Sequence, residues 1–133
     1  MSLPLNSIST RALAYLGDSV LEIRVRRFLV YEKGLSRSGD LNQAALLFVS
    51  APAQAEAMQK ILPLLEEEEA AVFHRGRNLG HSKTPKSATV AQYRAATGME
   101  VLFGYLSLSG REDRIDELFA AGFSEQLRDT SIS

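Results

Sequence analysis

The stretch that decides the fold runs from Arg11 to Glu22 and reads RALAYLGDSVLE. Its apolar residues recur three and four positions apart, which is the spacing of one face of an α-helix. These apolar residues are Leu13, Leu16 and Val20, with Ile23 just beyond. Ser9 or Thr10 can cap the start, so the pattern predicts a helix from about Thr10 to Tyr31.

Two lone acids interrupt apolar helix surfaces. Asp18 follows Gly17 in the first stretch, and Glu100 stands alone in the apolar run GMEVLFG over residues 98–104. A carboxylate in such a setting needs a partner. If the two helices pack against each other, Asp18 and Glu100 meet, and a hard divalent cation would be their most economical partner. Glu22, one helical turn after Asp18, is a candidate third ligand.

The alternative interpretation of these acids is purely structural. In that interpretation each carboxylate forms an ion pair with an arginine, and no metal is involved. The arginines that the sequence offers for this are Arg24, Arg26 and Arg94.

The rest of the chain also divides into helical segments. Further helices are expected over 41–49, 53–61, 63–77, 89–108 and 111–121, with a loop over 78–87. Asp40 can cap the first of these, Ser50 with Pro52 begins the second, and Pro63 opens the third. No segment alternates with period two, so we expect an all-α fold of five to seven helices and a loose tail after Phe123.

Length and composition limit the classes of function. The 133 residues, 45% of them hydrophobic, match a single domain with its core over about 10–123. The chain has no cysteine, which excludes thiolate chemistry and is typical of a reducing compartment. It shows neither an apolar run long enough to span a membrane nor a signal-peptide pattern, so we expect no membrane association and a cytoplasmic location.

Charge is unevenly distributed, although the formal net charge is only −1. No acidic residue lies between Glu69 and Glu100, a segment whose positive and histidine side chains are His74, Arg75, Arg77, His81, Lys83, Lys86 and Arg94. Such a segment suits a polyanion, or else it is a solvated loop without a partner. The spacing of His74 and His81 does not match a helical zinc site, and no nucleophile-elbow motif accompanies them.

Several motifs resemble those of the ribonuclease III family. Residues 11–22 are similar to its signature helix, and TGMEVLFG over 97–104 is similar to its second motif. Between them, RGRN over 75–78, PK over 85–86 and YRAATG over 93–98 resemble the Mini-ribonuclease III branch. The resemblance covers about Thr10 to Phe123. It implies a catalytic domain that stands alone, without a double-stranded-RNA-binding domain.

The resemblance implies roles for individual residues. Asp18 corresponds to the family's central metal-binding aspartate and Glu100 to its essential glutamate, and together they are the expected catalytic pair. Ala14 and Thr97 stand where the general family carries two further acids, which leaves less negative charge to hold two magnesium ions. Glu22 is a candidate substitute ligand. Mg²⁺ is the implied cofactor, with Mn²⁺ expected to substitute for it.

The implied reaction is hydrolysis of double-stranded RNA to 5′-phosphate and 3′-hydroxyl ends, with precursor 23S ribosomal RNA as the natural substrate. The residues expected to bind RNA are Arg75, Arg77, Asn78, Lys83 and Lys86. A homodimer is expected to cut both strands, with contacts through Tyr15, Leu16 and Leu21. Selectivity for ribosomal RNA would come from substrate shape or from helpers such as a ribosomal protein.

A different class of function stays open at this point. A protein of the same fold could bind structured RNA or a ribosomal particle without cutting it, and the two missing acids favour that alternative. The presence of Asp18 and Glu100 within their motifs favours the enzyme. A helical interaction module with no RNA role would require both motifs to be accidental.

Overall fold

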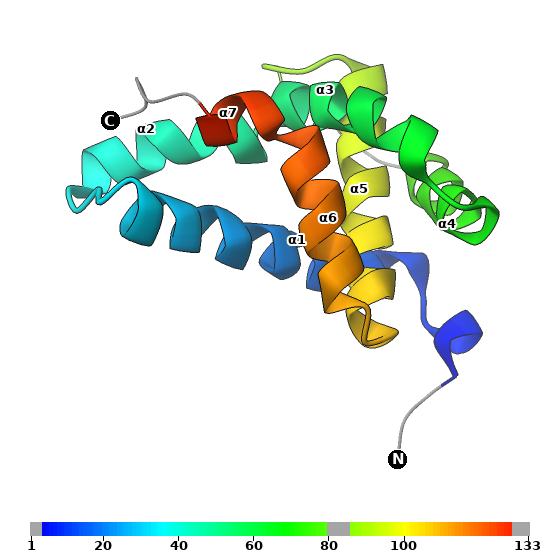
Figure 1. Cartoon of the computed structure of the whole chain (residues 1–133). Helices are drawn as coiled ribbons and strands as arrows, with labels where there is room; N and C mark the ends of the chain where they lie inside the picture. The colour runs from blue at the N-terminus through cyan, green and yellow to red at the C-terminus, as the bar shows by residue number, and fades with distance from the viewer. Residues whose placement is uncertain (1–3, 80–85, 129–133) are drawn as a thin grey trace.

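Helices make up all the regular structure in residues 4–79 and 86–128, the part of the chain that this computed structural model describes (Figure 1). In chain order they are η1 (Leu5–Ser7), α1 (Thr10–Arg27), η2 (Phe28–Glu32), α2 (Ser38–Val49), α3 (Ala51–Ile61), η3 (Leu62–Leu64), α4 (Glu67–Arg77), α5 (Val90–Leu108), α6 (Glu112–Gly122) and α7 (Ser124–Arg128). Seven of these are α-helices, and no strand occurs within the described ranges. The predicted all-α fold is confirmed.

The ends of α5 follow directly from its sequence. The Thr89 hydroxyl accepts a hydrogen bond from the Gln92 N–H at 3.0 Å, and the Gln92 side chain accepts one from the Thr89 N–H at 2.9 Å. This reciprocal pair satisfies two backbone donors that would otherwise lack partners. Ser109 caps the other end, and Gly110 follows with a φ of 73°, which glycine adopts without strain. The predicted limits of the long helix are confirmed.

The first predicted helix is continuous, but it changes from an α-helix to a π-helix near its end. Ser9 caps α1 by accepting a hydrogen bond from the Ala12 N–H at 3.0 Å. After Arg27 the chain continues as the π-helical turn η2, where the Lys33 N–H donates to the Phe28 carbonyl at 3.0 Å. The helical region therefore reaches Glu32, close to the predicted end, in two different forms.

Two predicted helix starts are wrong. Asp40 does not cap α2, because that helix begins at Ser38 and Asp40 lies within its first turn. Pro63 opens only the short 3₁₀ turn η3, and α4 begins at Glu67. The reason is a stronger signal further along: the Glu69 side chain accepts a hydrogen bond from the Glu66 N–H at 2.9 Å. The start of α3 is confirmed, since Ser50 accepts from the Ala53 N–H at 3.3 Å.

The chain after Phe123 was expected to be loose, and that expectation is also wrong for the residues described. Phe123 is fully buried and α7 follows it. The Gln126 side chain donates to the Leu47 carbonyl at 2.9 Å, and Glu125 forms an ion pair with Lys60 at 3.1 Å. These contacts hold α7 against α2 and α3.

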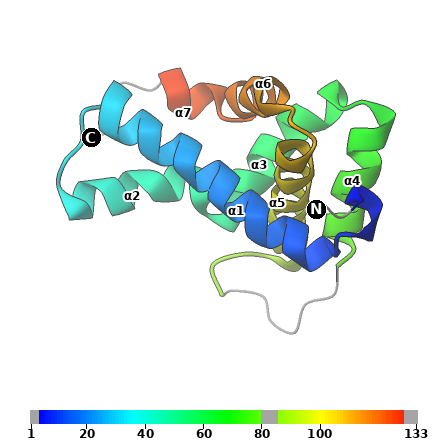
Figure 2. The ribbon, with the colours of Figure 1, turned by 90° about the horizontal axis from the view of Figure 1, so that it is seen from below.

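Helix α5 lies at the centre of the molecule, where it packs against α1, α3 and α4. Both ribbon views show α1 crossing α5, with α4 at the end of the molecule away from the α1–α2 connection (Figures 1 and 2). A cluster of the aromatic rings of Phe48, Phe119 and Phe123 fills the core beside α6, with centroids 5.2 to 6.2 Å apart. Among the described helices, none is both long and apolar enough to span a bilayer.

Candidate active site

Two glycines bring the backbones of α1 and α5 into direct contact. A Cβ atom at Gly17 would lie 1.6 Å from the carbonyl oxygen of Glu100, and one at Gly104 would lie 2.1 Å from the carbonyl oxygen of Leu13. Helix backbone atoms cannot move aside as a flexible side chain can, so no larger residue fits at either position without separating the helices. The crossing therefore holds Asp18, which follows Gly17, next to Glu100.

Asp18 and Glu100 line the same hollow, which has a volume of about 360 Å³. Asp18 is exposed, whereas Glu100 is half-buried. The remaining lining residues come from α1, from α5 and from the residue after Asn78: Arg11, Ala14, Tyr15, Leu79, Tyr93 and Thr97. The structure thus brings together the two acids that the sequence singled out.

The two carboxyl groups disturb each other electrostatically. Burial, the negative charge of Asp18 and a hydrogen bond with Asp18 together raise the pKa of Glu100 to about 8, and burial contributes most. Glu100 is therefore mostly protonated at neutral pH in the metal-free protein. A divalent cation between the two groups would reverse this preference, because it favours both ionised forms. The donor set, two hard carboxylate oxygens beside open space, fits a magnesium ion whose other ligands are water or phosphate.

Glu22 lies one turn after Asp18, but its carboxylate contacts an arginine of the same helix. Its carboxylate forms an ion pair with Arg26 at 2.9 Å and borders another hollow on α1, which Asp18 also lines but Glu100 does not. Within residues 4–79 and 86–128, no group of three or more acidic, histidine or cysteine side chains is placed to hold one metal ion. The role of Glu22 as a third ligand stays a prediction, and the present geometry supports only the pair.

The arginines proposed as structural partners have other contacts. Arg24 forms ion pairs with Glu112 and Asp116, both at 2.8 Å. Arg26 binds Glu22, and Arg94 borders a different hollow, on another side of α5. The structural alternative therefore gains no support from these three residues.

The positions of the two missing family acids border the same hollow. Ala14 offers no ligand atom, and Thr97 is buried with its hydroxyl donating to the Tyr93 carbonyl at 3.1 Å. The hydroxyl oxygen of Thr97 can still accept a hydrogen bond, but it carries no charge. The site therefore presents two carboxylates where four would otherwise stand.

The residues expected to bind RNA separate into three groups. Arg75 is tied to the start of α1, because its guanidinium donates to the Thr10 hydroxyl at 3.0 Å and to the Ile8 carbonyl at 3.5 Å. Arg77 and Asn78, at the end of α4, and Lys86, before α5, are exposed. Lys83 lies outside the described residues, as does His81. Arg75 thus has a structural contact in addition to its proposed role.

Sequence reasoning did not assign Arg11, Leu79 or Tyr93 to the site, although all three border the hollow. Helical spacing could have identified two of them. Arg11 precedes Asp18 by two turns of α1, and Tyr93 precedes Glu100 by two turns of α5, so each lies on the same face as its acid. Leu79 follows the end of α4 and offered no comparable pattern.

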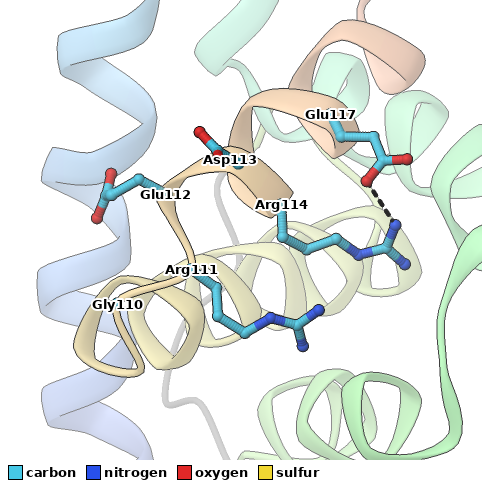
Figure 3. Close-up of a pocket in the computed structure, with 6 residues that line it drawn as sticks. All are labelled: Gly110, Arg111, Glu112, Asp113, Arg114 and Glu117. Carbon is cyan, nitrogen blue, oxygen red and sulfur yellow. Dashed lines mark hydrogen bonds and ion pairs between the residues drawn. The ribbon is translucent and has the colours of Figure 1, made fainter.

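A second hollow, of about 400 Å³, lies at the start of α6 (Figure 3). The side chains of Arg111 and Arg114 point to one side of this segment, and a dashed line marks the 2.9 Å contact of Arg114 with Glu117 (Figure 3). The Arg114 guanidinium also donates two hydrogen bonds, of 2.7 and 2.8 Å, to the buried carboxylate of Glu69. The hydrogen bond from Arg114 is the main reason that the pKa of Glu69 is lowered. These charges neutralise each other, so we regard the hollow as structural.

The predicted dimer contact needs one correction. Leu21 is only 1% exposed and packs into the core, so it cannot contact a second copy of the chain. Tyr15 is exposed, and Leu16 is half-buried against the core. The same helical segment also exposes Ile23 and Val30.

Comparison with known proteins agrees with this geometry. The model of the family described as "Ribonuclease III domain" matches residues 11–111. The chain is similar to Mini-ribonuclease 3 of Symbiobacterium thermophilum, with 46% identity over 86% of this chain and 88% of the relative, and to that of Brevibacillus brevis, with 42% identity over 90% and 88%. A crystal structure of a Fusobacterium nucleatum protein superposes with a TM-score of 0.83 and 26% identity, covering 94% of this chain and 99% of the other. The chain therefore belongs to the ribonuclease III family of endoribonucleases.

Proposed function

We propose that this protein is a magnesium-dependent endoribonuclease that cuts double-stranded RNA at the Asp18–Glu100 pair. The family implies duplex RNA as the class of substrate. The observation that carries the proposal is the meeting of these two carboxylates in one hollow, with burial and mutual repulsion raising the pKa of Glu100. Such a pair is strained without a cation and suited to binding one.

The protein's own groups have a limited set of tasks in this reaction. Asp18 and Glu100 would hold Mg²⁺, or Mn²⁺ in its place, and the crossing of α1 and α5 would keep their oxygens at a fixed separation. An ion held there would polarise the phosphodiester and lower the pKa of the attacking water. We propose hydrolysis to 5′-phosphate and 3′-hydroxyl ends as the reaction that this chemistry serves. Binding a metal requires Glu100 to release its proton, so occupancy should increase with pH.

RNA binding outside the pair would rely on phosphate contacts. Arg77 and Lys86 are exposed cations, and Asn78 is an exposed amide between them in sequence. Lys83 and Arg75 complete the proposed set, with Arg75 also supporting the start of α1. An A-form duplex is read mainly through its shape, phosphates and 2′-hydroxyl groups, so this set favours binding with little sequence preference.

We infer precursor 23S ribosomal RNA, in the cytoplasm, as the natural substrate. The similarity to curated Mini-ribonuclease 3 proteins over most of their length supports this inference. A catalytic surface with little base readout would take its selectivity from the shape of the RNA or from a helper such as a ribosomal protein.

We also propose a homodimer. The two strands of a duplex run antiparallel, so a pair of sites related by a two-fold axis can cut both strands in one encounter. The apolar side chains that α1 and η2 expose, Tyr15, Ile23 and Val30, support an isologous contact along this segment.

The proposal is tested by separating binding from cutting. Asp18→Asn keeps the size of the side chain but removes the charge that holds the cation. Cleavage of long duplex RNA in Mg²⁺ should fall by several orders of magnitude, while binding in Ca²⁺, measured by gel shift, persists. Asp40→Asn makes the same chemical change on an exposed acid of α2 and serves as the control. A folded Asp18→Asn protein that cuts at the normal rate would favour a non-catalytic RNA-binding role.

A further inference from the structure

The largest hollow described lies across α5 from the carboxylate pair, between α3, the end of α4 and the first turns of α5. Its volume is about 750 Å³. The floor is apolar and includes Met58 and Phe73, both buried, while Leu62 and Val90 are exposed at the rim. A hollow of this size with an apolar floor is typical of a ligand site.

The floor exists because α4 lies unusually close to α5. A Cβ atom at Gly98 would lie 2.6 Å from the ring of Phe73, and one at Gly76 would lie 2.8 Å from the Cα of Gly98. This close packing holds the Phe73 ring against α5, and the His74 ring packs at an angle to it with centroids 5.3 Å apart. His74 itself is exposed and lines the hollow, so the site offers an aromatic group beside the apolar floor.

The polar lining has one sign of charge. Arg77 and Arg94 are exposed there, and none of the described residues that line the hollow carries a carboxylate, in a chain with 16 acidic residues. The amides of Gln59 and Gln92 add hydrogen-bonding groups, and the N-terminal end of the 19-residue α5 adds a positive partial charge. Anionic and planar groups therefore fit this hollow, whereas a basic partner would be repelled.

The larger hollow and the catalytic hollow lie on different sides of α5, but neighbouring residues border them. Tyr93 and Leu79 border the catalytic hollow, whereas their neighbours Arg94 and Asn78 border the larger one. Both hollows are therefore reached from the same two short stretches of chain. The stretches that border the catalytic hollow, around residues 79 and 93, therefore lead directly to the larger hollow.

We propose that the larger hollow receives an unpaired nucleotide of the RNA substrate, a bulged base next to the cleavage site. The base would enter over the apolar floor and stack on His74 or on a guanidinium plane, while its phosphate lies near Arg77 and Arg94. Proteins bind unstacked RNA bases in this way, with aromatic rings, arginine planes and amide groups. The inference rests on the proposed function and specifies which duplexes the enzyme prefers.

The test compares two RNA duplexes that differ by a single unpaired nucleotide, bound in Ca²⁺ so that they are not cut. We expect the protein to bind the bulged duplex at least about fivefold more tightly than the perfect duplex, since one stacked base contributes at least this much. Arg94→Gln removes a cation from the rim, and Ala91→Trp fills the opening from an exposed position. Both variants should reduce the ratio of the two affinities to about one. Arg37→Gln, at an exposed arginine just before α2, should leave the ratio unchanged.

Crosslinking locates the base directly. A 4-thiouridine at the unpaired position should form adducts with residues 73–78 or 90–95, mapped by mass spectrometry. A ratio near one for the normal protein, or adducts elsewhere, would overturn the inference even if the perfect duplex is bound and cut. A protein that neither binds nor cuts the perfect duplex would overturn the proposed function, and the inference with it. Binding of a glutamate-rich helical peptide in this hollow, without a preference for the bulged RNA, would make it a protein interface instead.

Discussion

Glu100 keeps its proton because its carboxyl group is half-buried beside a second acid. In the unfolded chain the pKa returns to its ordinary value near 4.5, whereas in the folded metal-free protein the pKa is about 8. Between these values the folded state binds a proton that the unfolded state has released. Linkage therefore makes this residue's contribution to stability full below the lower value and progressively lost as the pH rises toward the upper one.

The first prediction follows from that linkage. The stability of the metal-free protein should fall between about pH 5 and pH 8, by at most about 1.4 kcal/mol per pH unit from this group. Glu100→Gln should reduce this pH dependence of the free energy of unfolding, because a glutamine does not titrate. Urea unfolding in the presence of a chelator measures it, with Asp40→Asn as a control that retains the slope. If the free energy of unfolding changed with pH in the same way for the normal protein and for Glu100→Gln, Glu100 would titrate as an ordinary exposed acid.

The sequence predicts the role of an acidic residue only where the residues that surround it in the structure are also near it in the sequence. Asp18 and Glu100 stood out because each interrupts an apolar helix surface, and both lie where the motifs place them. The sequence indicated Glu69 only as the last acid before a segment without acids, yet its side chain is 1% exposed. Its main partner, Arg114, lies far along the chain, and no local sequence pattern predicts such an ion pair.

At the scale of helices, the contact of α1 with α5 determines the geometry of the site. Gly17 and Gly104 each face a carbonyl oxygen of the opposite helix, so the two backbones touch at two points. Two contact points restrict both sliding and rotation of one helix on the other. The separation of the two acids is therefore a property of the backbone rather than of side-chain packing.

The second prediction tests this contact. Gly17→Ala should destabilise the protein by about 1–3 kcal/mol, or prevent folding, although alanine is the better helix former. Gly39→Ala is the matched control, because Gly39 lies in α2 with open space where the Cβ would be placed, and it should be neutral or stabilising by up to about 1 kcal/mol. Chemical unfolding of the two variants gives the comparison. Equal stability of the two would contradict the close contact.

The third prediction concerns the end of α4 and the residues before α5. Replacing Arg77 and Lys86 together by alanine should lower the slope of log affinity against log salt by about one to two units, because each phosphate contact releases counterions. Replacement of Arg27 and Arg37, two exposed arginines on α1 and beside α2, controls for net charge. Binding of duplex RNA in Ca²⁺ over a range of salt concentrations provides the slopes. An unchanged slope would mean that this segment is a solvated surface.

The start of a helix was predicted correctly where a single capping residue determines it. The prediction was wrong where two residues could each begin the helix. Ser50 and Thr89 are caps whose side chains bind the backbone of the next turn, and the predicted helices start at these residues. Pro63 is compatible with a helix start, but the hydrogen bond of Glu69 with the Glu66 backbone moved the start of α4 beyond it. The tail was expected to be loose, although Phe123 lies four residues after Phe119 and continues the apolar face of α6. The contacts that hold α7, with Leu47 and Lys60, come from parts of the chain that are distant in sequence.

At the scale of the whole molecule, the fourth prediction is a homodimer. Light scattering should return about twice the chain mass of 14.6 kDa. Ile23→Glu with Val30→Glu should produce monomers, because charges would replace the exposed apolar side chains of α1 and η2. Leu108→Glu, an exposed leucine at the end of α5, is the control and should leave the dimer intact. A normal protein of single-chain mass would contradict the prediction.

The buried ion pair of Glu69 and Arg114 has a consequence for the smallest fragment that can fold. The family match ends at residue 111, before Arg114 and before the rings of Phe119 and Phe123. A protein shortened to that boundary would retain Glu69 without its main counter-ion and would uncover Phe48. Arg111 would remain as the only arginine partner of Glu69 in the described structure, at 3.5 Å, and a buried carboxylate that loses its closest counter-ion is destabilising. Helix α6 is therefore part of the minimal catalytic unit, and any shortened or fused version of this nuclease has to include it.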